Sequence, residues 1–185
     1  MKHRVFDPLR LDVAAFAAEQ GELGGQWPLS TMTRLAEGTV APPEGDDEPV
    51  QWTVEGESRA RRAADPQVWL HLEADAVVWL QCQRCLKPVR EALQVQRSFR
   101  FVASEAEAEA EDAESEEDVL ALTRTLDLRA LVEDELLLEL PLVPRHEVCP
   151  EPLPLPPPDP LASQAEVAPN PFAQLAVLKR GKSSH

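Results

Sequence analysis

The sequence contains no tyrosine, and aromatic residues make up only 5% of its 185 positions. Few side chains are therefore available to stack on the bases of a single-stranded nucleic acid. Basic residues are also scarce, since 18 Lys and Arg against 33 Asp and Glu give a net charge of −15. Nine of the acidic residues and no basic ones lie in residues 104–118. This balance argues against a free-standing binder of bare nucleic acid.

Long apolar runs are absent as well. No stretch approaches the roughly 20 apolar residues that cross a bilayer, and the opening MKHRVFDPLR lacks the apolar region of a signal peptide. The chain has three cysteines, an odd number that fits a reducing compartment better than a disulfide framework. We therefore expect a cytoplasmic protein that has no membrane partner.

Catalytic motifs are missing from the sequence. It contains no G-x-S-x-G, no P-loop and no G-x-G-x-x-G. The four histidines lie far apart, and no nucleophile is placed beside a base. We expect a protein that is not an enzyme, with no catalytic residue and no small-molecule substrate.

Period-two alternation of apolar residues predicts several strands. It occurs over residues 27–35, 50–54, 68–82 and 89–101. Consecutive strands of this kind favour an antiparallel sheet, either open or partly closed towards a barrel.

Two helices are predicted beside the sheet. The first covers 12–20, with Asp12 as N-cap and Gly21 after its end. The second covers 127–140, where an apolar stripe follows Asp127 and Glu133, Asp134 and Glu135 form a solvated side. The predicted fold class is therefore α+β, with an N-terminal short helix and a packed helix near 127–140.

The remaining segments define the expected domain organisation. Residues 1–149 form one α+β domain in which the acidic segment 104–118 is a flexible loop. Residues 150–169 are a proline-rich linker. Residues 170–185 form a short helical docking segment that begins at Asn170 and Pro171.

Four side chains suggest a metal site. Cys82 and Cys85 have C-x-x-C spacing, and His146 and Cys149 have H-x-x-C spacing. Four soft ligands in two such pairs can hold zinc in a tetrahedron. The alternative is that the cysteines stay reduced and fill the end of a strand, with His146 in solvent. Thioredoxin-like chemistry is disfavoured because Pro88 and another strand follow the cysteines, where that chemistry needs a helix.

Other residues are candidates for binding a partner. Arg84 is constrained by its position between the two cysteines. The acidic residues Glu133, Asp134 and Glu135 could form a second surface. The terminal segment could form a third, through Phe172, Leu175, Lys179 and Arg180.

Four blocks of the sequence resemble one protein family. They are the strand end 80–85 followed by Lys87 and Pro88, the helix of 127–138, residues 140–144 with His146 and Cys149, and residues 170–180. Their content and order are similar to those of the YceD-like family, the large ribosomal RNA subunit accumulation proteins. The N-terminal half matches that family only in its general strand pattern.

The resemblance implies a cytoplasmic, non-enzymatic ribosome biogenesis factor that supports the synthesis, processing or stability of 23S rRNA. Its expected partners are a large-subunit ribosomal precursor, its rRNA or a basic ribosomal protein. The resemblance implies no cofactor, so zinc rests on the cysteine and histidine spacing alone. The competing hypothesis is a zinc-binding adaptor that acts on a non-ribosomal protein.

Overall fold

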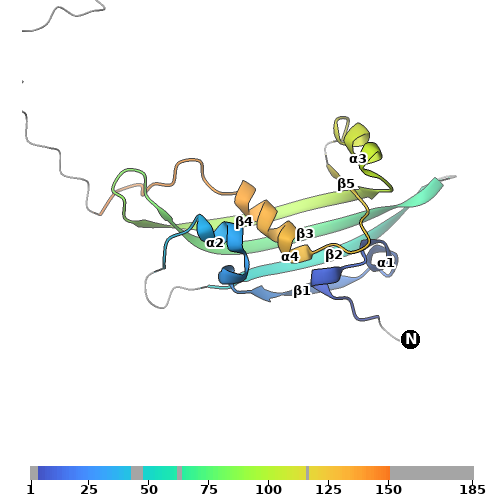
Figure 1. Ribbon diagram of the computed structural model, residues 1–185, viewed down its shortest axis with the longest axis horizontal. Coiled ribbons are helices and arrows are strands. Elements are labelled where there is room, and N and C mark those ends of the chain that lie inside the picture. The colour runs from blue at the N-terminus through green and yellow to red at the C-terminus, as the bar shows by residue number, and fades with distance from the viewer. Residues whose placement is uncertain (1–3, 43–47, 62–63, 116, 151–185) are drawn as a thin grey trace, which may run out of the picture. The chain divides into compact units, whose positions relative to one another are not determined.

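The alternating segments of the sequence form one five-stranded sheet. The computed structural model describes residues 4–42, 48–61, 64–115 and 117–150. The strands lie in the order β1-β2-β3-β4-β5, with β1 to β4 antiparallel and β5 parallel to β4 (Figure 1). Their bounds are β1 (Glu22–Trp27), β2 (Val50–Arg61), β3 (Ala64–Gln81), β4 (Pro88–Val102) and β5 (Asp118–Ala121).

The helices are short. They are the 3-10 helices η1 (Pro8–Arg10) and η2 (Leu29–Thr31), and the α-helices α1 (Val13–Ala18), α2 (Thr33–Glu37), α3 (Glu105–Asp112) and α4 (Leu128–Leu138). The predicted α+β class is confirmed, and the sheet is open because β1 and β5 form its two edges. Among the described residues, no helix has both the length and the apolar character that a membrane span requires.

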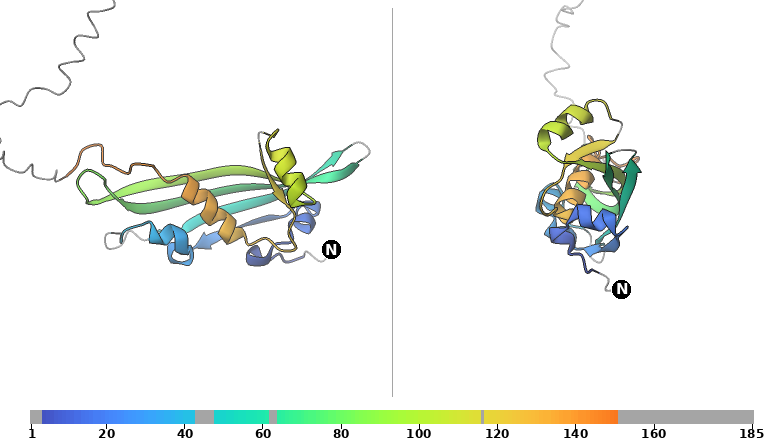
Figure 2. Two further views of the ribbon diagram at one scale, coloured as in Figure 1. Left: turned by 45° about the horizontal axis from the view of Figure 1, so that its top comes forward. Right: turned by 90° about the vertical axis from the view of Figure 1, so that its right-hand side faces the viewer.

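The core lies between one face of the sheet and α1, α2 and α4, which lie on the same side of it (Figures 1 and 2). Successive strand residues point to opposite faces, so the alternation in the sequence becomes one apolar face. The side chains that are completely buried come from both layers: Phe16, Leu35, Val54, Leu70, Leu72, Val78, Leu128, Val132 and Leu136.

The close packing of α1 on the sheet depends on a glycine. Asp12 caps α1 as predicted, because its carboxylate accepts a hydrogen bond from the Ala15 backbone N–H at 3.1 Å. Below the helix, a Cβ added at Gly56 would lie 2.9 Å from the Ala17 Cα and 2.7 Å from the Phe16 ring. A residue with a side chain at position 56 of β2 would push α1 away, so glycine is required there for this close approach.

One predicted strand is wrong. Residues 27–35 alternate as a strand would, but the strand ends at Trp27 and the chain continues as η2 and α2. Strand β1 lies earlier, over a segment that contains Gly24 and Gly25. Two glycines weaken the sequence signal of a strand, whereas pairing with Val50 to Glu55 of β2 forms it in the fold.

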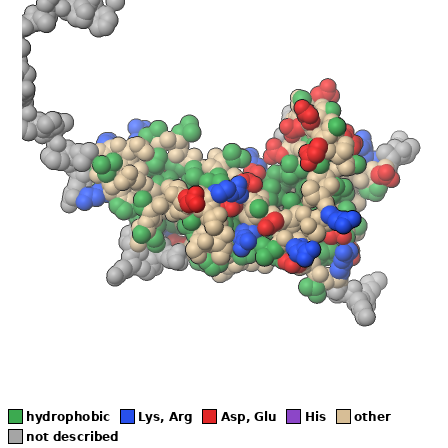
Figure 3. Space-filling view, in the orientation of Figure 1, with side chains coloured by type: hydrophobic (Ala, Val, Ile, Leu, Met, Phe, Trp, Pro, Cys, Tyr) green, Lys and Arg blue, Asp and Glu red, His purple; other side chains and the backbone are tan. Residues whose placement is uncertain are grey.

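The predicted acidic loop also needs correction. Residues 105–112 of the segment 104–118 form α3, and β5 begins at Asp118. The Ser104 hydroxyl caps α3 by accepting a hydrogen bond from the Glu107 backbone N–H, and Ala108 is buried against Val102 and Val119. Acidic side chains gather over α3 (Figure 3). Arg100 pairs with Glu111, and this cation offsets part of their mutual repulsion.

The described residues belong to one compact unit, which ends at Glu151. Apart from Pro150, the predicted linker 150–169 and the predicted docking helix 170–185 lie outside the described residues.

Candidate metal centre

The turn between β3 and β4, residues 82–87, brings the first two candidate ligands together. The Cys82 backbone N–H donates to the Lys87 carbonyl at 3.0 Å, and the Leu86 N–H donates to the Cys82 carbonyl at 2.9 Å. Leu86 adopts the left-handed conformation with φ of 60°. This closed turn leaves the thiols of Cys82 and Cys85 near one another.

The second pair of ligands arrives on residues 141–150, which we call the strap. The strap follows α4 and runs back along the sheet to the β3–β4 turn (Figure 1). There the Gln83 backbone N–H donates to the Pro144 carbonyl at 2.9 Å. The strap therefore places His146 and Cys149 beside Cys82 and Cys85, about 60 residues away in the sequence.

The four candidate ligand atoms form one cluster. The three sulfur atoms and one imidazole nitrogen all lie within 4.8 Å of one another. The Cys82 and Cys149 Sγ atoms are 3.9 Å apart, and Cys85 Sγ is 3.4 Å from His146 Nδ1. Zn–S bonds of about 2.3 Å and Zn–N bonds of about 2.0–2.1 Å place the corners of a tetrahedron about 3.5–3.8 Å apart. The donor set therefore fits a tetrahedral, thiolate-binding ion.

A backbone carbonyl sets the orientation of the His146 ring. His146 Nε2 lies 3.0 Å from the Pro88 carbonyl oxygen, which can only accept a hydrogen bond. In the neutral imidazole the proton is therefore on Nε2, and the lone pair of Nδ1 faces Cys85. A histidine that binds a metal has this same arrangement, with one nitrogen held by a carbonyl and the other on the ion.

Arg84 connects the turn to the strap. Its guanidinium donates to Cys149 Sγ at 3.1 Å and to the carbonyls of His146 at 2.8 Å and Glu147 at 3.1 Å. The sequence predicted a partner contact at this residue. In the structure, its polar atoms are engaged within the chain.

The two buried thiols differ in acidity. Burial opposes ionisation of Cys82, but backbone N–H groups, chiefly those of Cys85 and His146, outweigh burial and lower its pKa to about 5. Burial raises the pKa of the Cys85 thiol more than the Lys87 N–H lowers it. Cys82 can therefore supply a thiolate by itself, whereas Cys85 needs a cation to remove its proton.

The predicted solvated side of α4 comprised Glu133, Asp134 and Glu135. This prediction is wrong for two of the three residues. Glu133 and Glu135 are buried. The Glu133 carboxylate accepts hydrogen bonds from the backbone N–H groups of Arg34 and Leu35, at 2.7 and 3.1 Å. It thereby caps α2, which has no side-chain cap of its own.

Glu135 and Asp134 are also occupied within the chain. Glu135 lies 3.3 Å from the Arg97 guanidinium, and Asp134 pairs with Arg34. Burial raises the pKa of Glu135, and Arg97 offsets only part of this effect. The sequence had one clue to this ion pair, since Arg97 interrupts the apolar alternation of β4. The other predicted partner residues, Phe172, Leu175, Lys179 and Arg180, lie outside the described residues.

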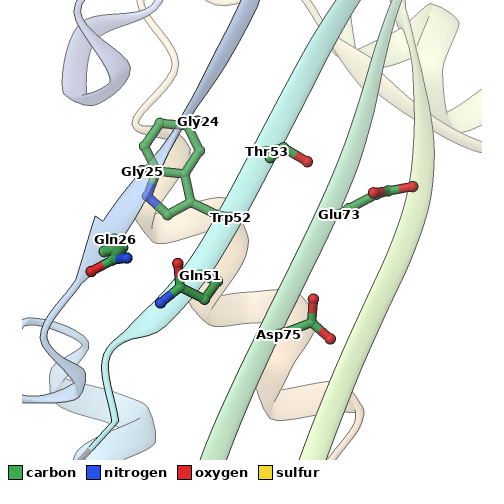
Figure 4. Close-up of a pocket in the computed structure, with 8 residues that line it drawn as sticks. All are labelled: Gly24, Gly25, Gln26, Gln51, Trp52, Thr53, Glu73 and Asp75. Atoms are coloured by element: carbon green, nitrogen blue, oxygen red, sulfur yellow. The ribbon is translucent and has the colours of Figure 1, made fainter.

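A shallow pocket of about 330 Å³ lies elsewhere, over β1, β2 and β3 (Figure 4). Its carboxylates are Glu73 and Asp75, which accept hydrogen bonds from Gln96 and Gln94. The residues of its wall include no cysteine, serine or histidine: they are Gly24, Gly25, Gln26, Gln51, Trp52, Thr53, Glu73 and Asp75. Its wall therefore offers two carboxylates and the Thr53 hydroxyl, but no imidazole base.

The fold and the cluster define a one-sheet α+β protein with a Cys₃His ligand set. Comparison with known protein families gives a match: residues 70–179 match the family described as large ribosomal RNA subunit accumulation protein YceD. The chain belongs to this family. It is 29% identical to the protein of that name from Haemophilus influenzae, over 94% of this chain and 96% of the relative. No solved structure matches.

Proposed function

We propose that this protein is a cytoplasmic, non-enzymatic biogenesis factor that supports the accumulation of 23S rRNA in the large ribosomal subunit. The observation that carries the proposal is the family match over residues 70–179. This range contains all four residues of the Cys₃His set, Arg84 and α4. The matched region is therefore the part of the chain that brings the strap back to the sheet.

The chemistry of the Cys₃His set favours a factor without catalytic activity. Catalytic zinc sites usually have three protein ligands and keep a position open for water or substrate, whereas structural sites use four protein ligands. Here four protein ligand atoms lie within 4.8 Å of one another. An ion held by all of them would have no free position for a substrate.

The charge of the sheet suggests which component of the precursor is contacted. We call the face opposite the helices the outer face. By strand register it includes Glu22 opposite Glu55, with Glu73 and Asp75 on the neighbouring strand β3. These four side chains are exposed, and like charges directly opposite one another in a sheet are destabilising. A basic ribosomal protein would relieve this repulsion, whereas rRNA phosphates would add to it.

The test is the ratio of 23S to 16S rRNA in cells that lack the protein and in cells complemented with the full chain. We expect a low ratio that the wild-type chain restores. A triple variant of the outer face, with Glu22, Glu55 and Glu73 changed to Gln, should restore it less well. The matched control removes three exposed charges on α3 by changing Glu105, Glu107 and Glu109 to Gln, and should complement fully. A normal ratio in the cells that lack the protein would contradict the proposal.

A second candidate function is a zinc-binding adaptor for a non-ribosomal protein. The Cys₃His cluster favours it, because small zinc sites often hold together domains that bind proteins. Sedimentation of a cell extract separates the two functions. The proposed biogenesis factor should travel with large-subunit precursors, and an adaptor unrelated to the ribosome should not.

A further inference from the structure

We propose that Cys82, Cys85, His146 and Cys149 bind one Zn²⁺ ion through three Sγ atoms and His146 Nδ1, and that this ion fastens the strap to the β3–β4 turn. The inference stands on the geometry of the cluster and does not depend on the proposed function. It gives the ion a structural task, which is to hold residues 141–150 against the sheet.

The choice of zinc follows from the donor atoms. Three sulfur atoms and one imidazole nitrogen are soft or borderline ligands, which exclude Mg²⁺ and Ca²⁺ in favour of zinc-like ions. Two of the ligand separations, 3.9 Å between Cys82 and Cys149 Sγ and 3.4 Å between Cys85 Sγ and His146 Nδ1, bracket the edges of a zinc tetrahedron. An octahedral oxygen site has neither these donors nor these spacings.

Apolar burial cannot account for the position of the strap. Leu142 is 100% exposed, Val148 is 85% exposed and Val143 is 58% exposed. Among the strap residues, Cys149 packs against the core, and its side chain is only partly buried. Since the apolar side chains face solvent, the strap is held by polar contacts at the turn and by whatever the Cys₃His cluster binds.

The surroundings of the cluster balance the charge of a bound ion. Three thiolates and Zn²⁺ leave one net negative charge, and the Arg84 guanidinium lies 3.1 Å from Cys149 Sγ. The same guanidinium holds two strap carbonyls, and the Pro88 carbonyl orients His146. Groups that fix and neutralise ligands in this way typically change metal affinity about 10–100-fold when they are removed.

The experiment measures the zinc content of the purified full chain by mass spectrometry, with and without Zn²⁺ added during expression. We expect one zinc per chain. The variants Cys149→Ser and His146→Ala should lose most of it, and the control Glu147→Gln should keep it, because Glu147 contributes only its backbone carbonyl. A wild-type chain without zinc, or full zinc retention in Cys149→Ser, would overturn the proposal.

A second measurement needs no variant and so avoids misfolded mutants. Co²⁺ added to the chelator-treated wild-type chain should give the intense visible absorption of a tetrahedral site together with sulfur-to-cobalt charge transfer. Removal of zinc should also expose the Gln83 amide, which donates to Pro144, to hydrogen exchange, while amides in the middle of β3 stay protected. Octahedral cobalt, a Cys82–Cys149 disulfide in the protein as isolated under reducing conditions, or unchanged Gln83 exchange would each contradict the proposed fastening.

Discussion

Helix α4 and the strap are neighbours in the chain, yet they are attached to the sheet in different ways. Helix α4 completely buries Leu128, Val132 and Leu136. The strap begins a few residues later and leaves Leu142 and Val148 in solvent. The first segment is held by apolar contact, and the second by a turn, an arginine and the contacts within the Cys₃His cluster.

This difference indicates which part of the molecule can unfold without the rest. Apolar burial couples α4 to the global core, because its buried side chains belong to the same apolar cluster as those of the sheet. The strap has few such contacts, so its opening should cost only the local polar contacts and the proposed zinc ion. Changes in α4 should therefore act on global stability, and changes at the strap should act locally.

The largest effect should come from a buried leucine of α4. Leu136→Ala should lower the free energy of unfolding by about 2–5 kcal/mol, because it leaves a cavity in the core. The matched control is Leu138→Ala on the same helix, where the side chain is exposed and the change should be within about 0.5 kcal/mol. Chemical denaturation measures both variants, and equal effects would remove the distinction between core and surface on α4.

A somewhat smaller effect should follow from adding one methyl group beneath α1. Gly56→Ala should lower the free energy of unfolding by about 1–3 kcal/mol, since the new Cβ would meet the Ala17 backbone at 2.9 Å. Gly38→Ala is the control, because its Cβ meets only a carbonyl oxygen at 3.5 Å and its backbone is helical. A Gly56→Ala protein as stable as the wild type would show that α1 can move away from β2 at little cost.

A similar or smaller effect, with a pH dependence, is expected at Glu133. Glu133→Gln should cost about 1–3 kcal/mol, because the carboxylate accepts two backbone N–H bonds at the start of α2. Asp134→Asn is the exposed control and should cost about 0–1 kcal/mol. Thermal unfolding compares the two variants with the wild type at neutral pH.

The pH dependence follows from the pKa of Glu133. Burial alone would raise this pKa, but the Leu35 and Arg34 N–H groups and the Arg34 guanidinium lower it below that of the unfolded chain. The stabilisation is therefore complete above the unfolded pKa and is lost as the pH falls through the folded pKa. The difference between wild type and Glu133→Gln should shrink in acid, and a difference that grew there would show that the carboxylate is not stabilised in the fold.

The smallest global effect should come from Arg84→Ala. It removes the guanidinium that joins the turn to the strap, yet the free energy of global unfolding should fall by no more than about 1 kcal/mol. Zinc affinity should weaken about 10–100-fold, and Gln83→Ala serves as the control within the same turn. Competition with a zinc chelator measures the affinity, and a large loss of global stability would show that the strap is part of the core.

Much of the fold could be predicted because its signals are local. The alternation of β2, β3 and β4 and the caps Asp12 and Asp127 depend on residues close in sequence. The misassigned segments are those where partners outside the segment itself decide. Strand β1 contains two glycines and is formed by pairing with β2, and α3 is anchored by Val119 and Arg100.

The candidate site shows the same division. The two pairs of soft ligands, their C-x-x-C and H-x-x-C spacing and the apolar stripe of α4 could be predicted from the sequence, because each is a property of residues within a few positions. Three features became visible in the folded chain alone: the strap returns to the β3–β4 turn, Arg84 joins the two, and Glu133 caps α2. These contacts join residues about 60 to 100 positions apart. Their formation depends on how the helices and the strap pack on the sheet, and a local sequence pattern does not specify that packing.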